Sequence, residues 1–488
     1  MSSYNYALSK PTLKPSNSKP PLFVPLIMWM IFAGSVSYLV LTFFINLDWN
    51  WLNILRFNDF TALIWTTVTF FSAIVSSYSR NYLKGFKFHS KFMGLCLCFT
   101  ISVMLLVVSN HITLFILSWI FMGLFMSQLI GIDKDWGEAK EALKFTRNYF
   151  LLGTGFLTLG ILLISVYTDT YTIEGLSKSV FDVPYYITFP SALLIIAAAI
   201  VQSAIYPFHR WLLSAMTSPT PASALMHAGF VNGGGILLTF FAVLLIESNT
   251  MTILFIIGGI TAVIAQFTKL LQVNVKQKLG CSTIAQMGFM IMQCGLGFFN
   301  AAVVHLILHG FYKAYLFLSS GEEIKQTQPK AASKIKIKPI QAIIVLLFGI
   351  LGAYLFTLWT GKSISADSGI FLTLIVAITV GQATYNIIKE QSLTSIQKIL
   401  VPPVLFIAGI GVYALFYNGV TTLMSDLPMI KNPNQLSWTQ IIFGMIFLLG
   451  FFIMKLGVYK KIPWLYVKLM NLSQPHYKTV LSYKLKSK

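Results

Sequence analysis

Long apolar runs alternate with short polar loops along the whole of this 488-residue chain. An α-helix needs about 20 apolar residues to cross about 30 Å of hydrocarbon, and fourteen runs approach or exceed that length. Two pairs of neighbouring runs, one within residues 93–131 and one within residues 282–319, are separated by so few residues that the boundary between the two runs is the least clearly defined. The predicted spans are residues 22–46, 60–78, 93–109, 111–131, 147–168, 188–206, 220–246, 252–271, 282–298, 300–319, 340–361, 368–388, 399–417 and 438–458.

Polar segments between and beside the spans divide the chain into units. We predict an all-α polytopic membrane protein with no sizeable soluble domain. The N-terminal segment is polar and contains prolines, so we expect a disordered tail and not a cleaved signal peptide. The predicted units are a cytoplasmic tail (1–21), N-terminal helices (22–92), a core (93–390) with a hydrophilic linker (321–339), C-terminal helices (391–458) and a basic cytoplasmic tail (459–488).

Composition and charge agree with a membrane protein. Hydrophobic residues make up 56% of the chain and charged residues only 10%, whereas a soluble domain carries about 25% charged residues. The net charge of +20 comes from Lys and Arg in alternate loops and tails, which is the pattern of the positive-inside rule with both termini cytoplasmic. This distribution excludes a nucleic-acid-binding domain. The lack of an extramembrane domain predicts a transporter subunit and not an enzyme.

Ionisable side chains within the apolar runs are the candidates for function. His305, His309 and Lys313 follow one another at i, i+4 and i+8, so they lie within about 40° of one line along a helix. Such groups are costly at membrane depth and usually mark an ion pathway. Imidazoles and amines can relay protons; the alternative is a core histidine or a lysine that extends to the interface. The predicted pathway residues are His227, His305, His309, Lys313, Lys269 and Lys362, of which Lys269 lies near a span end.

A metal site at His305 and His309 is the other chemistry that the i, i+4 spacing allows. No carboxylate or cysteine lies nearby in the sequence to complete a ligand set, and Lys313 would repel a cation. We therefore expect no metal and no other cofactor in this chain.

A second feature is the stretch "IVQSAIYPFHRWLLSAMTSPTPASALMHAGFVNGGG" at residues 200–235. An apolar run stops at a proline, two further prolines open the next run, and glycines follow His227. Interrupted helices at membrane depth line a cavity, because their freed backbone groups need partners; an ordinary loop with proline at the first helical turn is the alternative. The predicted residues of this broken-helix turn are Gln202, Pro207, His209, Pro219 and Pro221.

Three motifs resemble a known family. "YPFHRWLLSAMTSPTPASALMHAG", "VKQKLGCSTIAQMGFM" and "HLILHGFYKAYLFL" are similar to signatures of the antiporter-like subunits of respiratory complex I and Mrp-type antiporters. "EAKEALKFTRNYF" resembles that family's amphipathic link between two spans. The similarity covers roughly residues 58–390. It implies two inverted five-helix repeats, each with a broken helix, joined by a polar axis across the membrane centre.

The chain departs from the family at its charged positions. Ile120 stands where the family has a glutamate, Gln202 where it has the broken-helix lysine, and Asn274 where it has an acidic residue. Lys362 is the loose match to the lysine of the second broken helix. The departures put the family's standard charge switch in doubt for this chain.

Residues 282–321, which begin "STIAQMGFM", most resemble the DabB (MpsA) branch of the family. The resemblance implies a subunit in the bacterial plasma membrane that conducts H⁺ or Na⁺ and energises uptake of CO2 or bicarbonate. It also implies a soluble DabA-like partner that holds the zinc and resembles carbonic anhydrase. The alternatives are a pump subunit of a complex I-like or Mrp-like assembly, and a passive membrane anchor.

Overall fold

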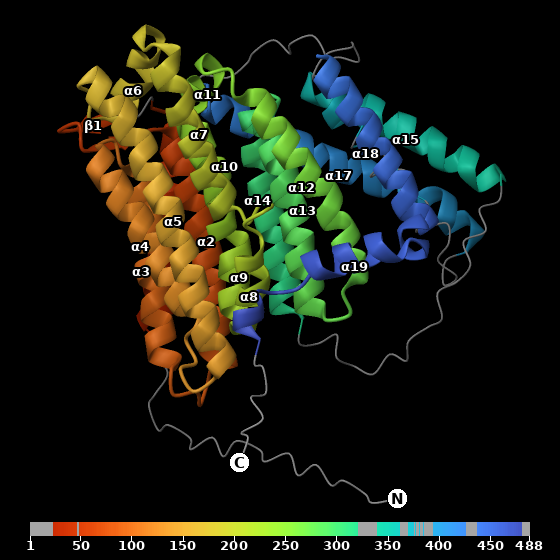
Figure 1. The fold of residues 1–488 in the computed structure, drawn as a ribbon, viewed down its shortest axis with the longest axis horizontal. Coiled ribbons are helices and arrows are strands. Elements are labelled where there is room, and N and C mark those ends of the chain that lie inside the picture. The colour runs from red at the N-terminus through yellow and green to blue at the C-terminus, as the bar shows by residue number, and fades with distance from the viewer. Residues whose placement is uncertain are drawn as a thin grey trace, which may run out of the picture.

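The computed structural model is a bundle of long helices, with a two-stranded hairpin and short helices at its ends (Figure 1). It describes residues 23–45, 48–320, 339–361, 369–374, 394–425 and 437–480, and positions 376, 380 and 384. Nine helices within these residues are long and apolar enough to cross a membrane. The protein is an all-α polytopic membrane protein, as the sequence predicts, and the count of fourteen spans stays a prediction.

Apart from residues 368–388, which the structure describes only in part, every predicted span contains helix. The N-terminal elements are α1 (Phe23–Thr42), β1 (Trp49–Trp51), β2 (Leu55–Phe57), α2 (Asp59–Tyr82), α3 (His89–Val108), α4 (Ile112–Ile130), α5 (Gly137–Thr168), α6 (Ile173–Ser179), η1 (Val180–Asp182) and α7 (Tyr185–Gln202). The central elements are α8 (Arg210–Ser214), η2 (Ala215–Thr217), α9 (Thr220–Ala228), η3 (Phe230–Asn232), α10 (Gly233–Phe240), α11 (Ala242–Glu247), α12 (Met251–Leu271), α13 (Val275–Gly295) and α14 (Phe299–Leu318). The C-terminal elements are α15 (Pro339–Thr360), α17 (Ser395–Leu423), α18 (Trp438–Leu456), η5 (Val458–Lys461), α19 (Pro463–Leu472) and η6 (Tyr477–Thr479).

Helix α5 differs from the sequence prediction. The segment "EAKEALKFTRNYF" is not a separate link between two spans, because α5 continues through it without a break from Gly137 to Thr168. Residues 138–152 contain no glycine or proline and are rich in strong helix formers. At 1.5 Å per residue its 32 residues reach about 48 Å, so the polar first turns extend beyond the hydrocarbon.

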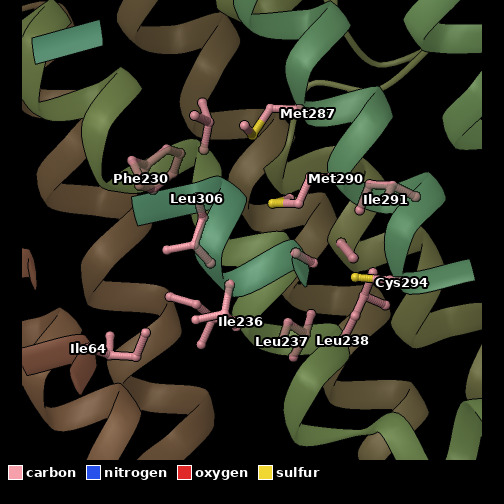
Figure 2. Packing of buried hydrophobic residues seen from close by; sticks show 14 of the residues in the cluster. Ile64, Phe230, Ile236, Leu237, Leu238, Met287, Met290, Ile291, Cys294 and Leu306 are labelled. Atoms are coloured by element: carbon pink, nitrogen blue, oxygen red, sulfur yellow. The ribbon is translucent and has the colours of Figure 1, made fainter. Parts of the chain in front are cut away.

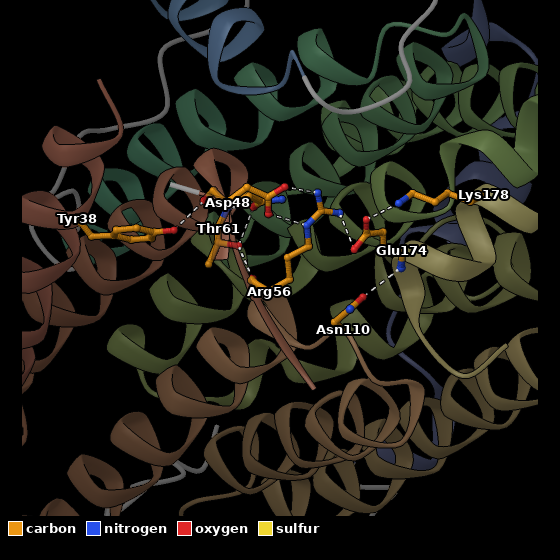
Figure 3. Close-up of polar contacts among 8 residues, drawn as sticks. Tyr38, Asp48, Arg56, Thr61, Asn110, Glu174 and Lys178 are labelled. Carbon is orange, nitrogen blue, oxygen red and sulfur yellow. Dashed lines mark hydrogen bonds and ion pairs between the residues drawn. The ribbon is translucent and has the colours of Figure 1, made fainter. Parts of the chain in front are cut away.

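One end of the bundle is held by an ion-pair network between the hairpin and α6 (Figure 3). The Arg56 guanidinium lies 2.7 Å from a carboxylate oxygen of Asp48 and 3.4 Å from a carboxylate oxygen of Glu174. The Glu174 carboxylate also forms an ion pair with the Lys178 ammonium, at 2.7 Å. The backbone N–H of Glu174 donates to the side chain of Asn110, at the α3–α4 junction. Hydrogen bonding to Arg56 lowers the pKa of Asp48 below its usual 3.8. The sequence pattern predicted neither β1–β2 nor α6.

The apolar core of the second part of the bundle lies between α10, α13 and α14. Figure 2 shows Ile236 of α10, Met287 and Met290 of α13 and Leu306 of α14 converging there. The neighbouring pair α12 and α13 packs backbone against backbone: a Cβ at Gly288 would lie 2.7 Å from the amide nitrogen of Ala262. Small residues allow this close approach, which is the usual basis of helix association in membranes.

The last part of the chain folds back onto the bundle. Residues 458–480, here named the C-terminal strap, form η5, α19 and η6 and contact α12, α8 and α5. Figure 1 shows α19 running crosswise over the lower part of α12, with which it is in contact. The sequence predicted only a basic tail in this region. The predicted N-terminal tail 1–21 and the linker 321–339 lie outside the described residues, apart from Pro339 at the start of α15.

Candidate functional site

The predicted break follows α7. Helix α7 ends at Gln202, residues 203–209 are not helical, and a short helix (α8) begins at Arg210. Pro219 lies at the N-cap of α9 and Pro221 in its first turn, where a missing N–H costs nothing. Pro207 lies within the break. The structure thus confirms an interrupted helix where the sequence placed it.

The next predicted span, 220–246, is itself divided into four short helical pieces. The first irregularity follows His227, at Gly229, and the 3-10 turn η3 comes directly after it. Asn232, which the sequence analysis did not single out, donates to the carbonyls of Ala228 (2.8 Å) and Leu306 (3.3 Å). It thereby ties this irregularity to α14.

Gln202 joins the two irregular regions without introducing charge. Its amide nitrogen donates to the carbonyl of Phe230 (2.9 Å), and the Ser203 hydroxyl donates to the carbonyl of Val231 (2.8 Å). These carbonyls belong to η3, where regular helical hydrogen bonding is interrupted. A side chain at Gly234 would overlap the Ser203 hydroxyl, so glycine is required for this approach. At the position where the family resemblance implies a lysine, this chain therefore has an uncharged glutamine that hydrogen-bonds to η3. We call the contacts of Gln202 and Ser203 with η3 the neutral clamp.

The predicted trio lies on one helix, α14. Lys313 is fully buried, His309 is 5% exposed and His305 is half-buried. The two imidazole rings are 6.0 Å apart and inclined by 15°. The Lys313 ammonium donates to the carbonyl of Leu279 on α13 (3.0 Å). The collinear arrangement predicted from the i, i+4, i+8 spacing is confirmed.

His227 joins the trio from α9. Its ring is fully buried and stacks on Phe317 of α14, with centroids 4.3 Å apart and planes inclined by 14°. Neither ring nitrogen of His227 or of His309 has a hydrogen-bond partner among the described residues. Buried polar groups are usually paired or hydrated, so these rings are suited to exchanging protons with water. We call His227, His309 and Lys313 the buried cluster.

Two further lysines act electrostatically on the buried cluster. Lys276, which the sequence analysis missed, donates from its ammonium to the Ser218 carbonyl (2.7 Å), just before α9. Both Lys276 and Lys313 act electrostatically on His227, and Lys269 of α12, half-buried, acts on Lys313. The sequence did contain a pattern that could have identified Lys276 as a site residue. This lysine belongs to the motif "VKQK" and lies in the first turn of α13, next to the broken-helix region.

No carboxylate of the described residues pairs with the buried cluster. The ion pairs formed by described residues lie in the hairpin network and in the polar segments beside α3 and α5. Asn274, at the family's acidic position, caps α13 by accepting from the N–H of Gln277 (3.3 Å). In the part of the chain that the structure describes, no group of three His, Cys, Asp or Glu side chains could hold a metal.

His209 is not part of the buried cluster. Its ring lies against Tyr206, with centroids 3.8 Å apart, and its Nε2 contacts the carbonyl of Leu472 in the C-terminal strap at 2.8 Å. A carbonyl oxygen only accepts, so Nε2 carries the proton in this contact. The predicted Lys362 lies outside the described residues.

The matching family model is described as the transmembrane region of NADH:quinone oxidoreductase and Mrp antiporters and covers residues 109–348. The chain is 30% identical over 404 residues to a probable inorganic carbon transporter subunit DabB of Hydrogenovibrio crunogenus, covering 80% of this chain and 74% of that protein. The chain belongs to the DabB family of antiporter-like membrane subunits. The DabB of Bacillus anthracis is 34% identical over 316 residues, which are 64% of this chain and 60% of that protein.

The length of the match differs among relatives. The chain spans only 47% to 60% of three DabB relatives. The fold matches a chain of the Mrp complex of Dietzia sp. with a TM-score of 0.56 at 22% identity, covering 93% of this chain and 49% of that one. The relatives are named as transporter subunits, in agreement with the prediction that the chain is not an enzyme.

Proposed function

We propose that this chain is the ion-conducting membrane subunit that energises uptake of inorganic carbon, as CO2 or bicarbonate. The observation that carries the proposal is the buried cluster of His227, His309 and Lys313 beside an interrupted helix. Ionisable groups inside a membrane protein mark ion pathways, and neutral imidazoles pass protons through their two nitrogens. The DabB names of the relatives support inorganic carbon as the transported substrate class.

The chemistry of the cluster favours H⁺ over Na⁺. Sodium ions need several oxygen ligands, whereas this cluster presents imidazole nitrogens and an ammonium group that repels cations. Among the described residues no carboxylate offsets that repulsion. The pathway we propose runs along His227, His305, His309 and Lys313, with Lys269 at one end and Lys362 as a further member.

We further propose a soluble, zinc-containing partner that resembles carbonic anhydrase and is of the DabA type. The relatives are each named as a transporter subunit, which supports a complex. The zinc belongs to the partner in this proposal, and the chemistry of CO2 hydration takes place there. The complex lies in the bacterial plasma membrane, with both termini of this chain in the cytoplasm.

Growth of a bacterial strain without carbonic anhydrase tests the proposal. Such a strain should grow in ambient air when this chain and its partner are produced together, and should fail with either one alone. The partner with its zinc ligands replaced is the matched control and should also fail. Rescue by this chain alone would contradict the two-subunit proposal.

A pump subunit of an Mrp-like or complex I-like assembly is the second candidate. The family description and the similarity to a chain of the Mrp complex favour it. Purification of the tagged chain from its native membrane separates the two functions. Recovery with one soluble zinc protein supports carbon uptake, whereas recovery with several hydrophobic subunits supports the pump.

Labelling of single cysteines tests the orientation. Lys178 of α6 and Lys84 after α2 are both exposed and lie toward opposite ends of the bundle. With Lys178→Cys an impermeant thiol reagent applied outside intact cells should react, and with Lys84→Cys it should not. The opposite pattern would place the termini outside and refute the proposed orientation.

A further inference from the structure

The C-terminal strap is fixed to the bundle on its inner side. Besides the contact of His209 with Leu472, the backbone N–H of His476 donates to the Ser214 hydroxyl (3.0 Å), and the Thr479 hydroxyl lies 3.0 Å from the same oxygen. The His476 ring stacks on Phe145 of α5 with centroids 4.3 Å apart. These contacts hold the strap across the end of the broken helix. They also fix which face of α19 points away from the bundle.

The outward face of α19 carries large apolar side chains beside polar ones. Trp464 is 68% exposed and Val467 is 56% exposed, whereas Leu469 of the same helix is 5% exposed and packs inward. Trp464 and Val467 are three residues apart and therefore neighbours on the helix surface. Large apolar residues on this face would be costly in water and need a hydrophobic environment.

The same segment is strongly basic. Exposed lysines accompany these apolar side chains: Lys460, Lys461, Lys468 and Lys478. None of these four forms an ion pair with a carboxylate that the structure describes. From Gly457 to Lys488 the sequence contains seven lysines and no aspartate or glutamate. The charge is therefore available for an external anionic group.

We propose that the C-terminal strap is an in-plane anchor for anionic phospholipids of the membrane surface. Tryptophan and valine beside lysines match the boundary between acyl chains and anionic headgroups. An acidic soluble protein would match the lysines but leave Trp464 and Val467 without an apolar partner. Helix α19 runs crosswise to α12 and contacts it (Figure 1), which is the orientation that a helix lying in the membrane surface requires. Bound lipid then stabilises the strap beneath the broken helix.

Quenching of Trp464 fluorescence by brominated lipids tests the anchor without any transport measurement. The full chain is placed in nanodiscs of phosphatidylcholine and phosphatidylglycerol, with one of the two lipids brominated. The Trp464 signal is the difference between the native chain and Trp464→Phe. We expect brominated phosphatidylglycerol to quench Trp464 at least about twofold more strongly than brominated phosphatidylcholine, because the lysines attract anionic headgroups.

A charge-matched pair of variants identifies the lysines responsible. Replacement of Lys460, Lys461, Lys468 and Lys478 by glutamine should remove the preference for phosphatidylglycerol. The control replaces four exposed lysines elsewhere by glutamine and should leave it unchanged: Lys84, Lys134, Lys140 and Lys278. Equal quenching by both lipids in the native chain overturns the proposal. So does absence of quenching, which is the result expected if an acidic protein and not lipid covers the strap.

Discussion

The N-terminal and central regions of the bundle bury polar groups of different kinds. Helices α2, α3, α4, α5 and α7, all described by the structure, have no His, Lys, Arg, Asp or Glu buried at mid-helix. At mid-helix their buried polar side chains are hydroxyls; buried His89, whose Nε2 has no partner among the described residues, and Gln202 lie at helix ends. Ser191 of α7 donates to the Gly160 carbonyl of α5 (2.6 Å), and Thr100 of α3 donates to Ser72 of α2 (2.7 Å). At mid-helix this neutral region therefore contains no buried group that titrates near neutral pH.

The region from α9 to α14 buries groups that can change their protonation state. His227 and His309 have ring nitrogens without partners among the described residues, and Lys313 binds a single backbone carbonyl. Unpaired buried groups cost stability, so a protein that retains them uses them. The comparison indicates that the neutral region serves as a scaffold and that the proposed pathway belongs to the region with imidazoles and lysines.

The largest effect is expected at Lys313. Lys313→Met keeps the length of the side chain and removes its charge, so ion flux in proteoliposomes and carbon uptake in cells should fall to background. Membrane levels of the protein should stay normal. Lys278→Met, which changes an exposed lysine of neighbouring α13, is the control and should keep full flux. Full flux in Lys313→Met would end the assignment of the pathway to α14.

The next largest effect is expected at the imidazoles. His227→Gln and His309→Gln retain polar side chains of similar size but cannot relay protons, so each should reduce flux by at least about tenfold, within the range for loss of a proton-transfer group. His111→Gln tests a histidine of the neutral region, which caps α4, and should leave flux unchanged. Equal losses in all three variants would show that the histidines act through folding.

A smaller and different effect is expected at the neutral clamp. Gln202→Leu leaves the Phe230 carbonyl without its donor, which should lower the free energy of unfolding by about 1 kcal/mol. Flux should remain within about twofold of the native value, because in our proposal no ion passes through the amide. Thermal unfolding and flux measured on the same preparation check both expectations. Ile120→Leu, at another position where this chain has a neutral residue and the family resemblance implies a charged one, is the control. Loss of flux in Gln202→Leu would place Gln202 on the pathway.

The smallest effect is expected in the hairpin network. Because Arg56 lowers the pKa of Asp48 in the folded protein, this pair stabilises the fold above pH 3.8 and loses that contribution as the pH falls through the lowered pKa. The pair is partly exposed, so the contribution should be less than about 1 kcal/mol. Asp48→Asn should therefore lower Tm slightly at neutral pH and show less further loss in acid.

Asp182→Asn provides the control for the hairpin network, since Asp182 is exposed and lies on the same side of the molecule, near α6. It should leave Tm unchanged at both pH values. A decrease in flux in Asp48→Asn at unchanged Tm would contradict the view that the N-terminal region is only a scaffold.

The sequence by itself determined the features that depend on neighbouring residues. Hydropathy located the helices, because each span must be apolar over its whole length. Helical spacing placed His305, His309 and Lys313 on one line. Prolines 207, 219 and 221 marked the break, because proline removes a backbone donor and cannot continue a helix. The same local rules failed at α5. The polar residues before position 147 predicted that the helix begins there, but these residues are good helix formers and the helix already begins at Gly137.

Only the tertiary structure decided which of these residues meet. The stacking of His227 on Phe317, the bond from Lys276 to Ser218 and the clamp of Gln202 join separate helices. Most of these contacts end on backbone carbonyls, and every residue offers such an acceptor, so the sequence carries no pattern that specifies the partner. The strap was missed for the same reason: its attachment to His209 uses the carbonyl of Leu472.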